Sequence, residues 1–182
     1  MQGLCYKVRR SRRRTIALQL LPDGTLLVRC PASLSDAQIR TFVESKQQWV
    51  CKHWQKMFSA GVPEKLTSEQ LRALGKVAAK RIEARAAWFA PRLGVSYNRI
   101  TIRTQRTRWG SCSGKANLNF NRLLILAPPE VLDYVVVHEL CHLRQMNHSP
   151  EFWKLVQSVL PEYGSSKQWL KENGNRLLAR LP

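Results

Sequence analysis

The segment LDYVVVHELCHL, residues 132–143, constrains the fold more than any other stretch of the chain. Apart from Asp133, His138, Glu139 and His142, every residue in this segment is apolar. An apolar stretch of this kind is typical of a helix face that is buried in the core. We therefore expect LDYVVV to form a buried helix face, which would hold the histidines on a rigid element.

The two histidines of this segment have the spacing of metal ligands. His138 and His142 are four residues apart, so on a helix both imidazoles can reach one ion. Glu139 follows the first histidine, and from there its carboxylate can act on a water molecule at the ion without binding the ion. This H-E-x-x-H arrangement predicts two zinc ligands and a general base. We expect Cys141, inside the motif, to be a small buried residue and not a ligand.

A catalytic zinc ion needs a third protein ligand and leaves its fourth position to water. We expect the third ligand to be His148, which lies at the corner before the next helix. Glu151 and Glu162 are the alternatives, as carboxylates of that following helix. The chain has four histidines and only His53 lies outside this region, so the grouping favours a metal site over unrelated core or capping histidines.

The cysteine pattern argues against a disulfide-stabilised fold. The chain of 182 residues can bury a core without covalent links. Its five cysteines are scattered and no pair has C-x-x-C spacing, which fits a reducing compartment. No stretch reaches the length of a membrane span, and the basic N-terminus is not followed by a continuous apolar run. We therefore expect a cytoplasmic protein that does not associate with membranes.

The charge balance is strongly basic. Thirty Lys and Arg residues stand against twelve Asp and Glu, which gives a net charge of +18. Such a surface attracts polyanions, and the run RRSRRR at residues 9–14 concentrates the charge. We expect weak nucleic-acid binding without sequence preference. The alternative is a basic surface that has no specific partner.

Periodicity and turn signals predict an α+β protein. We expect β structure within residues 6–30, with a hairpin turn at Pro22, Asp23 and Gly24. One or two helices then span about 36–58, and a capping box starts a long helix over 68–89. Strands follow at 98–105, 108–113 and 117–121, before the histidine-bearing helix and two further helices. The expected division is an N-terminal β-hairpin and helical lobe at 1–62 and a second domain at 63–182.

The stretch RTRWGSCS, residues 106–113, is a candidate wall of the site. A strand beside a metal-binding helix can pair with an extended substrate. Arg106 and Arg108 could hold a carboxylate or phosphate, and Trp109 could contact the substrate. The alternatives are core packing for Trp109 and Cys112, and a solvated surface for both arginines.

The strings RWGSCS, LNFNRLLILAPPEVLDYVVVHELCHL and NHSPEFW, in this order, resemble the YgjP-like metal-dependent hydrolases. That family is grouped with the zincin metallopeptidases and is similar to the SprT-like and WLM-type proteases. The resemblance implies a zincin-like fold, in which a small antiparallel sheet packs on the metal-binding helix beside an N-terminal β-rich lobe and a long linking helix. It also implies that His138, His142 and His148 bind zinc and that Glu139 is the catalytic glutamate.

Three functions remain open from the sequence. The first is a zinc-dependent hydrolase of the metallopeptidase type that acts on peptides in the cytoplasm. The second is a metal-dependent phosphohydrolase on nucleotides or other anionic substrates, although no phosphate-binding G-x-x-x-x-G-K-[ST] loop is present. The third is a DNA-associated protease or a nucleic-acid-binding protein. A structural zinc in the third case would require a fourth protein ligand, and none is evident.

Overall fold

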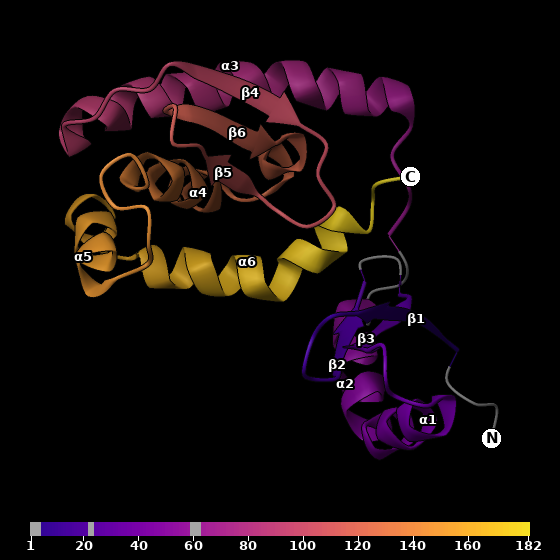
Figure 1. Ribbon diagram of the computed structural model, residues 1–182. Helices are drawn as coiled ribbons and strands as arrows, with labels where there is room; N and C mark the ends of the chain where they lie inside the picture. The colour runs from indigo at the N-terminus through magenta and orange to yellow at the C-terminus, as the bar shows by residue number, and fades with distance from the viewer. Residues whose placement is uncertain (1–4, 22–23, 59–62) are drawn as a thin grey trace. The chain divides into compact units, whose positions relative to one another are not determined.

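The computed structural model describes residues 5–21, 24–58 and 63–182 and confirms the α+β class (Figure 1). Contacts divide the chain into two compact units. The first contains residues 1–65 together with 175–180, and the second contains residues 66–174 together with 181–182. No helix among the described residues is long and apolar enough to cross a membrane.

The first unit is a three-stranded sheet with two helices. The strands are β1 (Tyr6–Ser11), β2 (Ala17–Leu20) and β3 (Leu26–Pro31). β3 lies in the centre, parallel to β1 and antiparallel to β2, which confirms the expected pairing of the two strands around the PDG sequence. Of the predicted turn, Gly24 has a positive φ of 81°, and Pro22 and Asp23 lie outside the described residues.

Two helices, α1 (Asp36–Ser45) and α2 (Gln47–Phe58), complete the core of the first unit. Ser35 caps α1 and forms a capping box with Gln38, so the helix start is fixed by local sequence. Alternate residues of β3 point into the core, as expected of a strand with one covered face. The buried cluster consists of Leu26, Val28, Cys30, Ile39, Val43 and Val50.

The second unit begins with the long helix α3 (Ser68–Leu93), which starts at the predicted capping box of Thr67. It ends at Gly94, whose left-handed φ of 62° is readily adopted by glycine, so the helix runs past the expected end at 89 and includes Pro91. Val77 lies outside the buried stripe of this helix, since it is 54% exposed. The stripe passes through the adjacent Ala78, about 100° away around the helix.

The sheet of the second unit contains β4 (Arg99–Arg103), β5 (Gly110–Cys112) and β6 (Asn117–Asn121) in the order β4-β6-β5. β5 pairs with β6 antiparallel, but β4 pairs with β6 parallel, so the sheet is mixed where an antiparallel one was expected. The reason is the strand order. β6 follows β5 through an antiparallel hairpin but lies between β5 and β4, and it runs in the same direction as β4.

The remaining elements are the 3₁₀ helix η1 (Arg122–Leu126), α4 (Pro129–Cys141), α5 (Pro150–Val159) and α6 (Tyr163–Leu178). α4 contacts α3, α5 and β5, and almost all of its apolar residues are buried. Two hydrogen bonds of 2.6 and 2.7 Å join the Arg85 guanidinium of α3 to the Asp133 carboxylate of α4. The predicted buried helix is therefore the centre of this unit, as Figure 1 shows.

Candidate metal centre

The three predicted histidines lie together at the C-terminal end of α4. His138 is in the last turn, and His142 is the C-cap residue with φ −64° and ψ −18°, so it keeps helical backbone and the same face. His148 lies in the segment between α4 and α5, before the Ser149 cap. The Nε2 atom of His138 is 3.2 Å from that of His142 and 3.0 Å from that of His148.

This spacing fits a tetrahedral metal ion. Zinc–nitrogen bonds of about 2.0–2.1 Å place two ligand nitrogens about 3.3 Å apart. The possible ligand atoms of the three histidines all lie within 4.8 Å of one another, and among the described residues no carboxylate belongs to this group. Neither Glu151 nor Glu162, the alternative third ligands, is therefore near enough to share it. The donor set present is three imidazoles, which suits zinc.

Hydrogen bonding and burial favour neutral imidazoles whose Nε2 lone pairs can bind a metal ion. The Nδ1 of His142 lies 3.0 Å from the Gln145 carbonyl oxygen, and donation to that oxygen leaves the Nε2 lone pair free. Burial, then the neighbouring His142 and His148, lower the pKa of His138 to about 3, so its ring is neutral at pH 7. The three Nε2 atoms cannot all find hydrogen-bond partners among themselves. One bound cation would accept the lone pairs of all three.

Glu139 is held beside the sheet. It is only 6% exposed and has no hydrogen-bond or ion-pair partner among the described residues. A Cβ atom placed on Gly110 of β5 would lie 2.5 Å from its Oε1 atom, so the carboxylate lies directly against the backbone of that strand. Burial raises the pKa of Glu139 to about 8. A divalent cation nearby would lower this pKa and favour the carboxylate form.

Asn121, at the end of β6, organises the loop that leads into β5, and sequence reasoning missed it. Its side chain is fully buried, and Nδ2 donates to the carbonyl oxygens of Gln105 at 2.7 Å and Arg108 at 3.1 Å. Its Oδ1 accepts from the Leu123 backbone N–H at 3.1 Å. The only signal in the sequence was a polar residue between two apolar runs, which is also typical of an exposed turn.

The three candidate substrate-binding residues are adjacent to β5. Arg106 and Arg108 are exposed, and Arg106 donates to the main-chain oxygen of Pro182. Neither arginine has a hydrogen bond or ion pair with the histidines or Glu139 among the described residues. Trp109 is half-buried and packs on the core, and a Cβ on Gly174 of α6 would lie 3.1 Å from its Nε1. The observed contacts of Trp109 are therefore packing contacts.

An aromatic group from α5 and α6 flanks the cluster and was not predicted. The Trp153 ring stacks on His148 at 5.8 Å and 27°, and on Tyr163 at 5.5 Å and 14°. The ammonium of Lys167 lies 3.8 Å from the Trp153 ring centroid. Lys167 has no acidic partner among the described residues. This uncompensated cation contacts the same Trp153 ring that stacks on His148.

Family comparison identifies what kind of protein this centre belongs to. The family model described as YgjP-like, metallopeptidase domain, matches residues 14–76 and 60–173. The chain belongs to this family. The resemblance seen in the sequence motifs is thereby confirmed, and membership supports a metal-dependent peptidase. The family match includes α4 and the three histidines of the YgjP-like chain.

Two solved structures are similar to part of this YgjP-like chain. One is the metallopeptidase zymogen abylysin of Pyrococcus abyssi, with 22% identity and a TM-score of 0.46, covering 50% of this chain and 92% of that one. The other is the metallopeptidase zymogen jannalysin of Methanocaldococcus jannaschii, with 24% identity and a TM-score of 0.42, covering 50% of this chain and 91% of that one. No curated protein matches the chain.

Proposed function

We propose that this protein is a zinc-dependent metallopeptidase in which His138, His142 and His148 bind the metal and Glu139 is the general base. The observation that carries the proposal is the convergence of three imidazole Nε2 atoms, with a buried carboxylate on the residue that follows His138. Membership of a metallopeptidase family supports peptide bonds as the substrate class.

The chain's own residues have separate tasks in this reaction. A zinc ion held by the histidines supplies Lewis acidity and lowers the pKa of water to about 7. Glu139 accepts a proton from the attacking water at its carboxylate and later returns it to the leaving amine. Because the Glu139 carboxylate has no hydrogen-bond or ion-pair partner among the described residues, no competing interaction holds it in an unproductive position.

The sheet edge beside α4 suits an extended peptide. β5 pairs with β6 on one side only and is the edge strand of its sheet, and it contacts α4. A substrate strand can add to such an edge through main-chain hydrogen bonds. Arg106 and Arg108 precede this strand and Trp109 adjoins it, and we propose that they contact the substrate next to the scissile bond.

Metal analysis joined to a peptide screen tests this proposal. Protein purified without added metal is analysed for its elements, and the metal-free protein is reloaded with zinc and incubated with a peptide library read by mass spectrometry. We expect one zinc per chain and cleavage that requires the reloaded metal. Failure of zinc to bind, or full occupancy without cleavage of any peptide or protein, would contradict the proposal.

The five cysteines also bear on where the protein acts. All of them are free thiols, and two are buried. Free thiols persist in reducing compartments, so we propose that the protein acts in the cytoplasm. Cell fractionation with an antibody to the native chain tests this.

A second candidate, a metal-dependent phosphohydrolase, has one observation in its favour. Lys167 places a cation without an acidic partner beside the cluster, where it could bind a phosphate or carboxylate group of the substrate. A panel of nucleoside triphosphates, tested with the same reloaded protein, separates the two activities. Release of inorganic phosphate or pyrophosphate with no peptide cleavage would favour this candidate over the peptidase.

A further inference from the structure

The sheet of the first unit has one covered and one open face. Successive residues of a strand point to opposite faces, and residues paired across strands share a face. The row that contains Val28 faces the core under α1 and α2, where Val28 is fully buried. Two rows on the opposite face consist of Lys7, Leu27 and Gln19, and of Arg9, Arg29 and Ala17.

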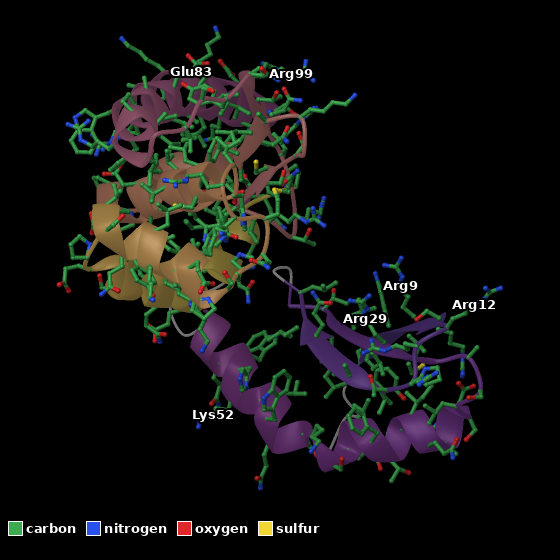
Figure 2. All side chains as sticks on the ribbon, turned by 60° about the vertical axis from the view of Figure 1, so that its left-hand side comes forward. Arg9, Arg12, Arg29, Lys52, Glu83 and Arg99 are labelled. Atoms are coloured by element: carbon green, nitrogen blue, oxygen red, sulfur yellow. The ribbon has the colours of Figure 1, made fainter. Side chains whose placement is uncertain are left out.

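The open face is basic and its charges are not neutralised. Lys7, Arg9 and Arg29 are exposed and have no ion pair among the described residues. On the covered face, by contrast, Arg10 bonds the Asp36 carboxylate at 2.6 Å. Figure 2 shows Arg9 and Arg29 extending from the sheet, with Arg12 following at the end of β1. We call Lys7, Arg9 and Arg29 the basic sheet face.

The register places two of these charges directly opposite each other. Arg9 and Arg29 are Cα partners on adjacent strands, and neighbouring strands are only about 4.8 Å apart. Like charges opposite each other destabilise a sheet. A bound polyanion would remove this repulsion, because one row of phosphates can neutralise both guanidinium groups at once.

We propose that the basic sheet face binds the phosphate backbone of double-stranded nucleic acid without sequence preference. The paired rows of the open face carry no aromatic side chain, so they offer no platform for the base stacking that favours single strands. Leu27 is the one large apolar residue in these rows and it is half-buried, so the rows lack the exposed aromatic and large apolar residues that anchor a protein in a membrane interface. A duplex presents about one charge per 1.7 Å of its axis, which complements closely spaced cations.

The test is a matched pair of charge reversals in the full chain. Arg9→Glu/Arg29→Glu changes the basic sheet face, and Lys76→Glu/Arg81→Glu makes the same change in net charge on exposed residues of α3. Binding of a labelled duplex of mixed sequence is followed by fluorescence anisotropy over a range of salt concentrations. Arg9→Gln/Arg29→Gln is a milder variant, and circular dichroism checks that each variant is folded.

We expect the first pair to weaken binding at least tenfold and to reduce the salt slope by about two, and the α3 pair to weaken it less than threefold. Hydrolysis of a short peptide should be unchanged in both pairs, because neither lies in the metal centre. Equal losses in the two pairs would show diffuse attraction by net charge and overturn the proposal. Tighter binding of single strands, or equally tight and equally sensitive binding of phosphatidylserine vesicles, would also overturn it.

Discussion

At the scale of single residues, the site depends on a glycine as much as on its charged groups. Gly110 gives Glu139 the space it occupies, since any side chain on β5 at this point would overlap the carboxylate. The strand β5 was expected to form a wall of the site, and its backbone at Gly110 lies directly against the candidate base. This contact limits the positions that the Glu139 carboxylate can take.

Gly110→Ala should reduce peptide hydrolysis about 10²-fold, because a misplacement of about 1 Å of a catalytic group can cost that much. Metal content should remain at the wild-type value, since Gly110 is not one of the three candidate ligands. The matched control is Gly114→Ala, where a Cβ atom meets nothing within 4 Å. Turnover and zinc content are measured for both variants. Wild-type turnover in Gly110→Ala would show that the position of Glu139 is unimportant.

Glu139→Gln separates the base from the ligands. The amide is nearly isosteric with the carboxylate but cannot accept a proton at neutral pH, so turnover should fall about 10²- to 10⁴-fold. Zinc occupancy should be unchanged, because Glu139 is not part of the three-histidine group. Paired measurements of metal content and turnover decide the matter, and undiminished turnover at full occupancy would exclude Glu139 as the base.

At the scale of elements, short connections hold the metal centre in place. His148 lies between two helices, and Ser149 begins the second helix by accepting the Phe152 N–H. On the other side, Asn121 ties the loop before β5 to the end of β6. Both connections place a residue of the site by hydrogen bonds to the backbone, so small changes there should act on the centre through geometry.

His148→Ala should lower zinc affinity, whereas Glu151→Ala and Glu162→Ala should not. The reason is that the imidazole of His148 is 3.0 Å from His138 Nε2, while the two carboxylates lie outside the ligand group. Competition with a fluorescent zinc chelator measures the three affinities side by side. Loss of the metal in Glu162→Ala, with retention in His148→Ala, would mean that the third ligand is the glutamate.

Asn121→Ala should lower the free energy of unfolding by at least about 2 kcal/mol, since it removes one buried and two part-buried hydrogen bonds to the backbone. The control is Asn98→Ala, whose exposed side chain donates one hydrogen bond to the Lys115 carbonyl oxygen, and we expect it to cost less than about 1 kcal/mol. Urea unfolding followed by tryptophan fluorescence provides both values. Equal losses of unfolding free energy in the two variants would show that burial of Asn121 does not increase the contribution of its hydrogen bonds to stability.

At the scale of the whole molecule, the chain uses the same sheet topology twice. In each unit the third strand lies in the centre, parallel to the first and antiparallel to the second, and helices follow it. The two sheets carry different chemistry: the second supports the metal centre, and the first presents the basic sheet face. The chain has a net charge of +18, and its candidate reactive groups all belong to the second unit.

Removal of the metal should loosen the second unit and leave the first unchanged. A metal ion held by His138, His142 and His148 would join the end of α4 to the segment before α5, and a ligand at 100 times its Kd stabilises the folded state by about 2.7 kcal/mol. Hydrogen exchange with and without a chelator measures the effect at each peptide. We expect faster exchange in residues 138–152 and no change in β1–β3. Equal changes in both units would indicate that the ion stabilises the chain elsewhere.

The sequence by itself determined the features that depend on local periodicity. The helical repeat places His138 and His142 one turn apart, and it does so wherever that helix lies. The starts of α1, α3 and α5 follow from cap residues that bond N–H groups three positions ahead. The approach of His148 could be inferred because only a few residues separate it from His142 and a helix start follows it directly.

The tertiary structure alone decided which distant residues meet. Gly110 and Glu139 are in contact because β5 lies at the sheet edge against α4, and nothing within either segment specifies that approach. The same holds for Trp153 and Lys167 beside the histidines, and for Arg9 opposite Arg29. Strand order and helix packing are set by the burial of apolar surface over the whole unit, a sum over many residues that no local pattern contains.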